Sequence, residues 1–213
     1  MKRAYQELVE KPKFSLDTNR QAKLVRPLYM GLLSKEQEEF AKKRLIQAME
    51  NYGWRLGTGF LSTPFILDVL SSIDPKHAYR LLENEEMPGW LYMAKNDTGT
   101  IWEGWEGPNA QQGISSLNHY SKGAMVEWLF SGMLGVRVDG ENHFDLNPII
   151  GGHVDFAKGR YRSIYGEISS SWEKKGNKVH CHFEIPPNTT ATLHLGEAMH
   201  ELEAGSHDFE AML

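Results

Sequence analysis

The sequence contains one cysteine, Cys181, among 213 residues. A single cysteine excludes an internal disulfide framework, so the chain shows no need of an oxidising compartment. No apolar run is long enough to cross a bilayer. The first fourteen residues begin with basic side chains but lack the apolar stretch of a signal peptide. We therefore expect a soluble, cytoplasmic protein with no membrane partner.

Basic blocks are also missing, and the formal net charge is -5. Nucleic acid is therefore excluded as the main partner, because its phosphates are held by clustered lysine and arginine. Aromatic residues, in contrast, are plentiful, with six tryptophans, eight tyrosines and nine phenylalanines. They suffice for a hydrophobic core and for a ligand cleft in one large domain or two small ones.

The aromatic residues are most informative over residues 99–107, which read GTIWEGWEG. Glu103 lies between Trp102 and Trp105, and Glu106 follows. Sugar-cleaving sites use this combination, because an aromatic face stacks on the apolar face of a pyranose and a nearby carboxylate can activate water. In the alternative interpretation both tryptophans belong to the core and Glu103 is a solvated loop residue. Spacing alone favours that alternative.

Helical signals occupy the chain up to about residue 140. Ser34 and Gln37 predict a capping box at the start of a helix that ends at Gly53. Signals for two further helix starts occur at Thr63–Pro64 and at Asp74–Pro75. A long helix is expected from about residue 116 to residue 134. Helices joined by informative loops in this way are typical of bundles and helical toroids.

From about residue 142 the hydrophobic period changes to two. One predicted inward row consists of Val179, Cys181, Phe183 and Ile185, and another of Ala191, Leu193 and Leu195. Turns are predicted at residues 175–177 and 186–188. The pattern predicts a small antiparallel β-sandwich domain over residues 141–213.

Three histidines in this part, His180, His182 and His194, suggest a metal site at first sight. They alternate with the buried positions, so we interpret them as an outward-facing polar row, since a metal site also needs converging ligands and supporting contacts. We expect neither a metal nor another cofactor.

Five motifs occur along the chain in the order TGFLSTPFILDVL, TIWEGWEG, SLNHYSKGAMVEWLF, NPIIGGHVDFAKGRYRSIYGEISSSW and IPPNTTATLHLG. Together they resemble the C-terminal part of bacterial α-L-rhamnosidases, glycoside hydrolase family 78. The resemblance covers the chain from about Leu16 to its end. It implies an α+β multidomain fold, with helices of a partial (α/α)6 six-hairpin toroid over residues 1–140 and a C-terminal β-sandwich over residues 141–213. It also implies hydrolysis of terminal α-L-rhamnose with inversion.

The resemblance implies that Glu103 is the general base that activates water. It also implies that His119 contacts the sugar, although its residue type alone favours a core histidine. The other candidates for substrate contact are Trp102, Trp105 and Tyr92, with Glu106 as a supporting residue just outside the substrate contacts.

The general acid of that family lies in an acidic loop far upstream, and no such loop precedes residue 99 here. Glu103 and Glu106 cannot replace the pair, because side chains three apart on a helix have Cβ atoms about 5–6 Å apart. Inverting enzymes hold their carboxyl groups about 6.5–9.5 Å apart on opposite faces of the sugar. We therefore expect a C-terminal fragment that lacks the general acid.

The alternative function is a non-catalytic carbohydrate-binding or interaction fragment that complements an N-terminal chain. In either case the expected partners are a rhamnose-containing saccharide, and either a second copy or an N-terminal fragment. Association would use apolar helix faces left uncovered, which we expect to expose Leu67, Leu70, Leu81 and Leu82.

Overall fold

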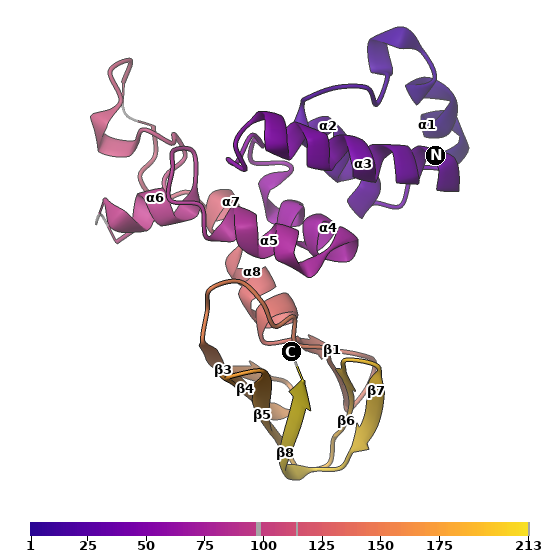
Figure 1. Ribbon diagram of the computed structural model, residues 1–213, viewed down its shortest axis with the longest axis vertical. Coiled ribbons are helices and arrows are strands. Elements are labelled where there is room, and N and C mark those ends of the chain that lie inside the picture. Colours follow the sequence, from indigo (N-terminus) through magenta and orange to yellow (C-terminus); the bar gives the residue numbers. More distant parts are fainter. Residues whose placement is uncertain (97–98, 114, 213) are drawn as a thin grey trace. The chain divides into compact units, whose positions relative to one another are not determined.

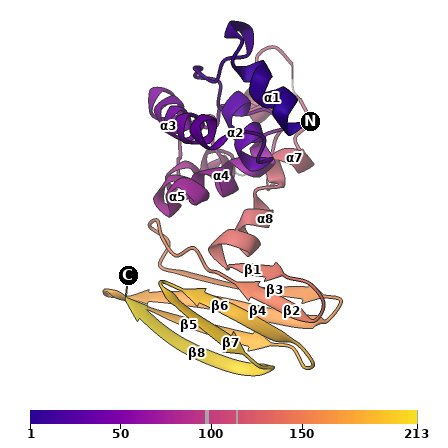
Figure 2. The same ribbon diagram turned by 90° about the vertical axis from the view of Figure 1, so that its right-hand side faces the viewer.

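The computed structural model describes residues 1–96, 99–113 and 115–212. The chain divides into two compact units, which we name the helical unit (Met1–Met125) and the β unit (Val126–Leu213). Figure 1 labels their elements, and Figure 2 gives a second view. The helical unit contains α1 (Lys2–Val9), η1 (Pro12–Phe14), α2 (Gln21–Tyr29), α3 (Lys35–Asn51), η2 (Thr63–Phe65), α4 (Ile66–Ile73), α5 (Pro75–Leu82), α6 (Trp90–Lys95), η3 (Gly107–Asn109) and α7 (Tyr120–Gly123).

Two predicted helix starts are confirmed by their capping contacts. The Ser34 side chain accepts a hydrogen bond from the backbone N–H of Gln37, and the Gln37 side chain accepts one from the N–H of Ser34. The carboxylate of Asp74 accepts from the N–H of Lys76 at 3.0 Å. These contacts satisfy donors that a helix start leaves unpaired.

The signal at Thr63–Pro64 predicted Thr63 as the residue that caps the next helix, and this prediction is wrong. Ser62 precedes the short helix η2, and the hydroxyl of Thr63 donates to the carbonyl of Gly59 at 3.0 Å. The hydroxyl therefore bonds to the preceding turn and does not cap the helix. This bond stabilises the glycine-containing connection between α3 and α4.

The expected long helix over residues 116–134 is also wrong. Only α7 in the helical unit, with α8 (Val126–Trp128) and the π-helix η4 (Leu129–Met133) in the β unit, form helical turns there. The backbone of Ser116 and His119 instead hydrogen-bonds to residues 101–103. Residues 117 and 118 form a bend between these two bonded positions, which a continuous helix would not permit.

The helical unit buries the leucines that we expected to be exposed. Leu67, Leu70, Leu81 and Leu82 are all buried. That expectation is therefore wrong, because α4 packs against α5 and α2 and these elements cover one another's apolar faces.

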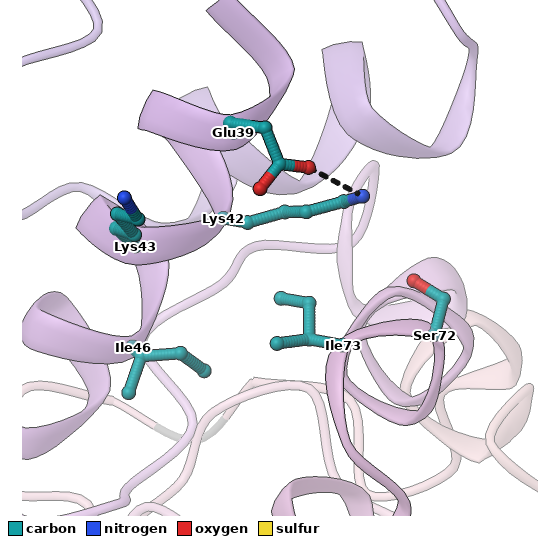
Figure 3. A pocket seen from close by; sticks show the side chains of 6 residues that line it. All are labelled: Glu39, Lys42, Lys43, Ile46, Ser72 and Ile73. Carbon is teal, nitrogen blue, oxygen red and sulfur yellow. Dashed lines mark hydrogen bonds and ion pairs between the residues drawn. The ribbon is translucent and has the colours of Figure 1, made fainter. Parts of the chain in front are cut away.

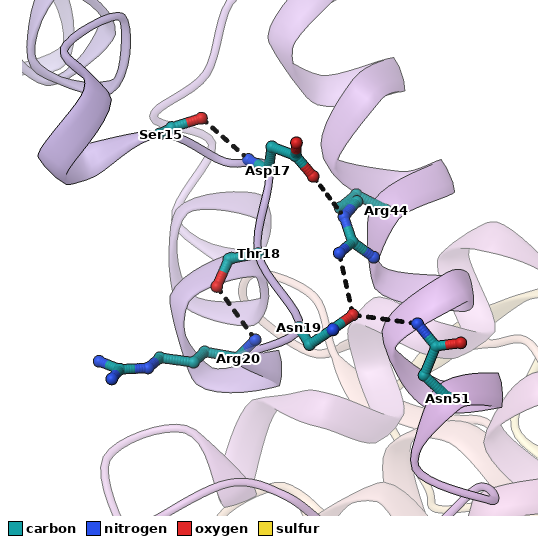
Figure 4. A network of polar contacts seen from close by, with 7 residues as sticks. All are labelled: Ser15, Asp17, Thr18, Asn19, Arg20, Arg44 and Asn51. Atoms are coloured by element: carbon teal, nitrogen blue, oxygen red, sulfur yellow. Dashed lines mark hydrogen bonds and ion pairs between the residues drawn. The ribbon is translucent and has the colours of Figure 1, made fainter.

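Polar contacts fasten the segment between η1 and α2 to helix α3 (Figure 4). Arg44 bridges Asp17 and Asn19, with Nε 2.9 Å from Asp17 Oδ1 and Nη2 2.9 Å from Asn19 Oδ1. Asn51 donates to the same Asn19 oxygen at 3.1 Å. Asn19 therefore joins the middle and the end of α3 to the segment that leads into α2.

The β unit is a sandwich of two four-stranded sheets, in the orders β1-β2-β6-β7 and β3-β4-β5-β8. Its strands are β1 (Val136–Val138), β2 (His143–Leu146), β3 (Phe156–Ser163), β4 (Gly166–Lys175), β5 (Lys178–Ile185), β6 (Thr190–Leu195), β7 (Ala198–Leu202) and β8 (Gly205–Met212). Neighbouring strands run antiparallel, except that β2 and β6 are parallel. The turn at Gly176–Asn177 joins β4 to β5 within one sheet, and the turn after Ile185 carries the chain into the other sheet.

The core of the β unit lies between the two sheets and under η4. Both predicted inward rows are buried, which confirms the alternation read from the sequence. The indole N–H of Trp172 donates to the carbonyl of Met133 at 2.8 Å, and the hydroxyl of Ser170 donates to that of Leu134 at 2.7 Å. These bonds attach the end of η4 to β4.

His180, His182 and His194 face outward beside carboxylate partners, as the alternation indicated. His182 lies between Asp208 and Glu184, with Nδ1 2.8 Å from Asp208 and Nε2 3.0 Å from Glu184. Its hydrogen bond to Asp208 raises the pKa of the His182 imidazole, with a smaller contribution from Glu184. The pair of His182 with Asp208 connects β5 to β8 across the sheet.

Cys181 should react slowly with a thiol reagent in the folded protein. Its side chain is buried in the core, and burial raises the pKa of the thiol to about 11, so little reactive thiolate forms near pH 8. Labelling with Ellman's reagent should be slow before guanidinium is added and rapid afterwards. Fast, stoichiometric labelling of the native protein would show that the inward row has been assigned to the wrong face.

Candidate functional site

The site is built where residues 101–103 lie beside residues 116–119. The N–H of Glu103 donates to the carbonyl of Ser116 at 2.8 Å, and the N–H of His119 donates to that of Ile101 at 2.7 Å. The N–H of Ser116 also lies 3.3 Å from Glu103 Oε2. Two motifs that are separate in the sequence are thus paired. The exposed Glu103 carboxylate is oriented by a backbone donor.

Trp102 lies in the core next to Glu103 and is fully buried, at 0% exposure. Its ring packs edge-on to Tyr92, with centroids 6.4 Å apart, and the backbone N–H of Trp102 donates to the sulfur of Met93 at 3.4 Å. Gly107 has φ +55°, and a Cβ there would come within 2.2 Å of the Trp102 ring. Trp102 therefore packs rather than presenting a face to a sugar, and it anchors the backbone that carries Glu103.

Trp105 is half-buried and lies over a lysine. The Nζ of Lys122 is 3.7 Å from the centroid of the Trp105 ring and 3.2 Å from the carbonyl oxygen of Thr58. Lys122 is only 4% exposed. Burial lowers the pKa of its ammonium to about 8, and the negative charge of Glu103 opposes that shift.

Sequence reasoning missed Lys122. Lysine is among the residues least often buried, so the pattern offered no reason to place it inside. Its position three residues after His119, at the start of a short helical segment, is the signal that could have drawn attention to it.

His119 is half-buried among aromatic rings. It stacks on Tyr120 with ring centroids 5.6 Å apart, and its edge contact with Phe60 has a separation of 6.3 Å. Among the described residues, its Nδ1 is buried without a hydrogen-bond partner.

Tyr92 and Glu106, both predicted near the site, share a hollow of about 480 Å³. The hollow is lined by Met87, Tyr92, Glu106, Asn109, Gln111 and Gln112. Its carboxylate and amide groups could hydrogen-bond to a polar ligand. Glu103 and His119 are not part of this lining.

A second hollow, of about 520 Å³, lies between α3 and α4 (Figure 3). Lys42 crosses it and pairs with Glu38 at 2.7 Å and with Glu39 at 3.3 Å. None of the predicted site residues lines it.

Two further findings concern the part of the chain that the structure describes. No helix there combines the length and apolar character needed to span a bilayer. No group of three or more histidine, cysteine, aspartate or glutamate side chains there is arranged to hold a metal ion.

Residues 1–133 match the family model of the bacterial α-L-rhamnosidase six-hairpin glycosidase domain, and residues 138–210 match that of the bacterial α-L-rhamnosidase C-terminal domain. An α-L-rhamnosidase of Formosa agariphila is 34% identical over 176 residues, which are 79% of this chain and 19% of that protein. One of Streptomyces avermitilis is 33% identical over 181 residues, 80% of this chain and 17% of that protein. The chain therefore spans about a fifth of the length of these relatives.

Two solved structures have the same fold over most of the chain. The Streptomyces avermitilis α-L-rhamnosidase complexed with L-rhamnose has a TM-score of 0.83 at 28% identity, covering 91% of this chain and 22% of that one. The native α-L-rhamnosidase from Aspergillus terreus has a TM-score of 0.86 at 27% identity, covering 97% and 26%. The two matched domains, in this order, show that the chain belongs to the bacterial α-L-rhamnosidase family.

Proposed function

We propose that this chain carries the general-base half of an α-L-rhamnosidase site, with Glu103 as the base of an inverting hydrolysis. The observation that carries the proposal is the pairing of residues 101–103 with residues 116–119. That pairing leaves the Glu103 carboxylate exposed and holds one of its oxygens near the N–H of Ser116. A general base for water must be accessible and fixed in orientation, and this arrangement meets both needs.

In this mechanism Glu103 takes a proton from a water molecule as the water attacks the anomeric carbon. The attack comes from the side of the sugar opposite the leaving group, so the configuration inverts. Trp105 and His119 border the same segment and supply an aromatic face and a ring nitrogen toward the sugar. Tyr92 and Glu106 line the neighbouring hollow and are assigned a supporting role.

The leaving oxygen needs a proton from a general acid on the other side of the sugar. Glu106 lies on the same short loop as Glu103, and neighbours on one loop cannot flank a substrate. We therefore propose that the acid comes from outside these 213 residues. On this proposal the chain binds rhamnose but does not hydrolyse rhamnosides by itself.

A second candidate function is a non-catalytic fragment that completes a toroid with an N-terminal chain. The observation that favours it is the small part of each solved relative that this chain matches, which is 22% of one and 26% of the other. Co-purification with a helical protein of complementary length, with no rhamnose bound, would support this candidate.

The experiment combines binding and turnover. L-rhamnose is titrated into the purified chain by calorimetry, with L-fucose as the control sugar, and release of nitrophenol from 4-nitrophenyl α-L-rhamnoside is followed in parallel. We expect saturable rhamnose binding and no release above the blank. Turnover in the usual enzyme range of about 1–1,000 per second would contradict the proposal that the general acid comes from outside these residues. No rhamnose binding would overturn the proposed base site.

His119→Ala is expected to weaken rhamnose binding by about 0.5–1.5 kcal/mol, the size of one net hydrogen bond. The melting temperature should change little. His77→Ala is the matched control, because the Nδ1 of His77 is also buried without a partner among the described residues. It should leave rhamnose affinity unchanged. A large stability loss at His119 with unaltered affinity would instead identify a core histidine.

A further inference from the structure

We propose that Lys122 is a positioning residue of the sugar site, whose ammonium holds the Trp105 ring beside Glu103 and so makes rhamnose binding depend on the Lys122 proton. The inference rests on the proposed function. It adds to that function a positioning residue, and a loss of rhamnose affinity at high pH, that the sequence motifs did not indicate.

The geometry places Lys122 at a junction of three segments. Its Nζ lies over the Trp105 ring and donates to the carbonyl of Thr58. Its own carbonyl accepts from the indole N–H of Trp90 at 2.9 Å. One residue therefore ties the connection before η2, the loop that carries Trp105, and helix α6.

A lysine is an unfavourable choice for a position that needs only packing. Burying an ammonium costs free energy that an apolar side chain of the same length would avoid. An ammonium over an indole face is attracted to the ring, and the attraction grows as water is excluded. Because Trp105 is half-buried, the ring can meet lysine on one side and a ligand on the other.

The charges around Lys122 give the expected direction with pH. Glu103 is the ionisable group whose charge acts on Lys122, and it favours the ammonium. The other contacts, Thr58, Trp90 and Trp105, carry no group that titrates in this range. Burial lowers the pKa of Lys122 to about 8, so the ammonium loses its proton as pH rises through that value. The attraction that holds Trp105 is then lost.

The test compares the wild-type chain with Lys122→Arg and Lys122→Met between pH 6.5 and 9.5. Tryptophan fluorescence and rhamnose affinity are measured in parallel, and Trp105→Leu assigns the Trp105 part of the signal. In the wild type we expect a fluorescence step centred near pH 8 and an affinity that falls about tenfold across it, the scale of one desolvated cation–π contact. Far-UV circular dichroism checks that each variant is folded.

Arginine keeps its charge throughout this range. Lys122→Arg should therefore retain rhamnose binding at pH 7 and lose the step near pH 8. Lys122→Met should bind rhamnose weakly at every pH.

A wild-type fluorescence signal that does not change with pH, or wild-type rhamnose affinity in Lys122→Met, overturns the proposal. If no protein binds rhamnose at any pH, the proposed function fails and the sugar-binding part of this inference fails with it. The fluorescence step then still decides whether Lys122 controls Trp105.

Discussion

Glu103→Gln is expected to reduce kcat on an aryl α-L-rhamnoside at least ~100-fold, a typical loss when general-base catalysis is removed. The measurement needs an assembly in which this segment is joined to a general acid. Glutamine keeps the shape of the side chain and an oxygen for the N–H of Ser116, but it cannot take a proton from water. The fold should therefore be preserved while the chemical step is lost.

Glu106→Gln is the matched control for this change. It lies three residues away on the same exposed loop and lines the neighbouring hollow instead. We expect it to lower kcat much less. If kcat of Glu103→Gln stays within about tenfold of wild type, below the usual range for a general base, Glu103 is not the base.

Phe183→Ala is expected to destabilise the β unit by about 3–5 kcal/mol, the usual cost of truncating a buried phenylalanine. Its side chain is 0% exposed and packs against Phe209 with ring centroids 6.4 Å apart. Alanine would leave a cavity between the two sheets, and the sheets cannot easily shift to close it. Urea denaturation followed by circular dichroism measures the change in the free energy of unfolding.

Phe156→Ala provides the comparison, because Phe156 lies in the same sheet but is 67% exposed. Surface substitutions usually change stability by less than about 0.5 kcal/mol. Equal effects at the two positions would mean that Phe183 does not lie in the core of the β unit.

The β unit was the most predictable part of the chain. Alternation identified Val179, Cys181, Phe183 and Ile185 because a strand with one buried face repeats every two residues. The parallel pairing of β2 with β6 was not predictable, because hairpin signals describe only neighbours in sequence. The leucines of α4 and α5 were assigned correctly to apolar faces. What covers those faces depends on helix packing, which periodicity does not specify.

The sequence named the candidate residues of the site but did not indicate how they are arranged in space. The motif around Glu103 predicted an aromatic and acidic site, and the pairing of Glu103 with Ser116 came only from the fold. The roles of the two tryptophans differ for the same reason. Trp102 packs against Gly107, and Trp105 lies over Lys122, although their sequence surroundings are similar. Tertiary contacts, which a local pattern does not contain, separate a core residue from an accessible one.

The parallel pairing of β2 and β6 also determines when the sandwich can close during synthesis on a ribosome. Leu146 of β2 pairs with Leu193 of β6, and β3, β4 and β5 are made between them. At a translation rate of about 5–20 residues per second, roughly 2–10 s pass between the synthesis of β2 and that of its partner strand β6. The β3-β4-β5 meander can form first, since its strands follow one another directly. During that interval the edge of β2 is open to other chains, so translation speed across residues 147–190 should influence how much of the nascent protein aggregates.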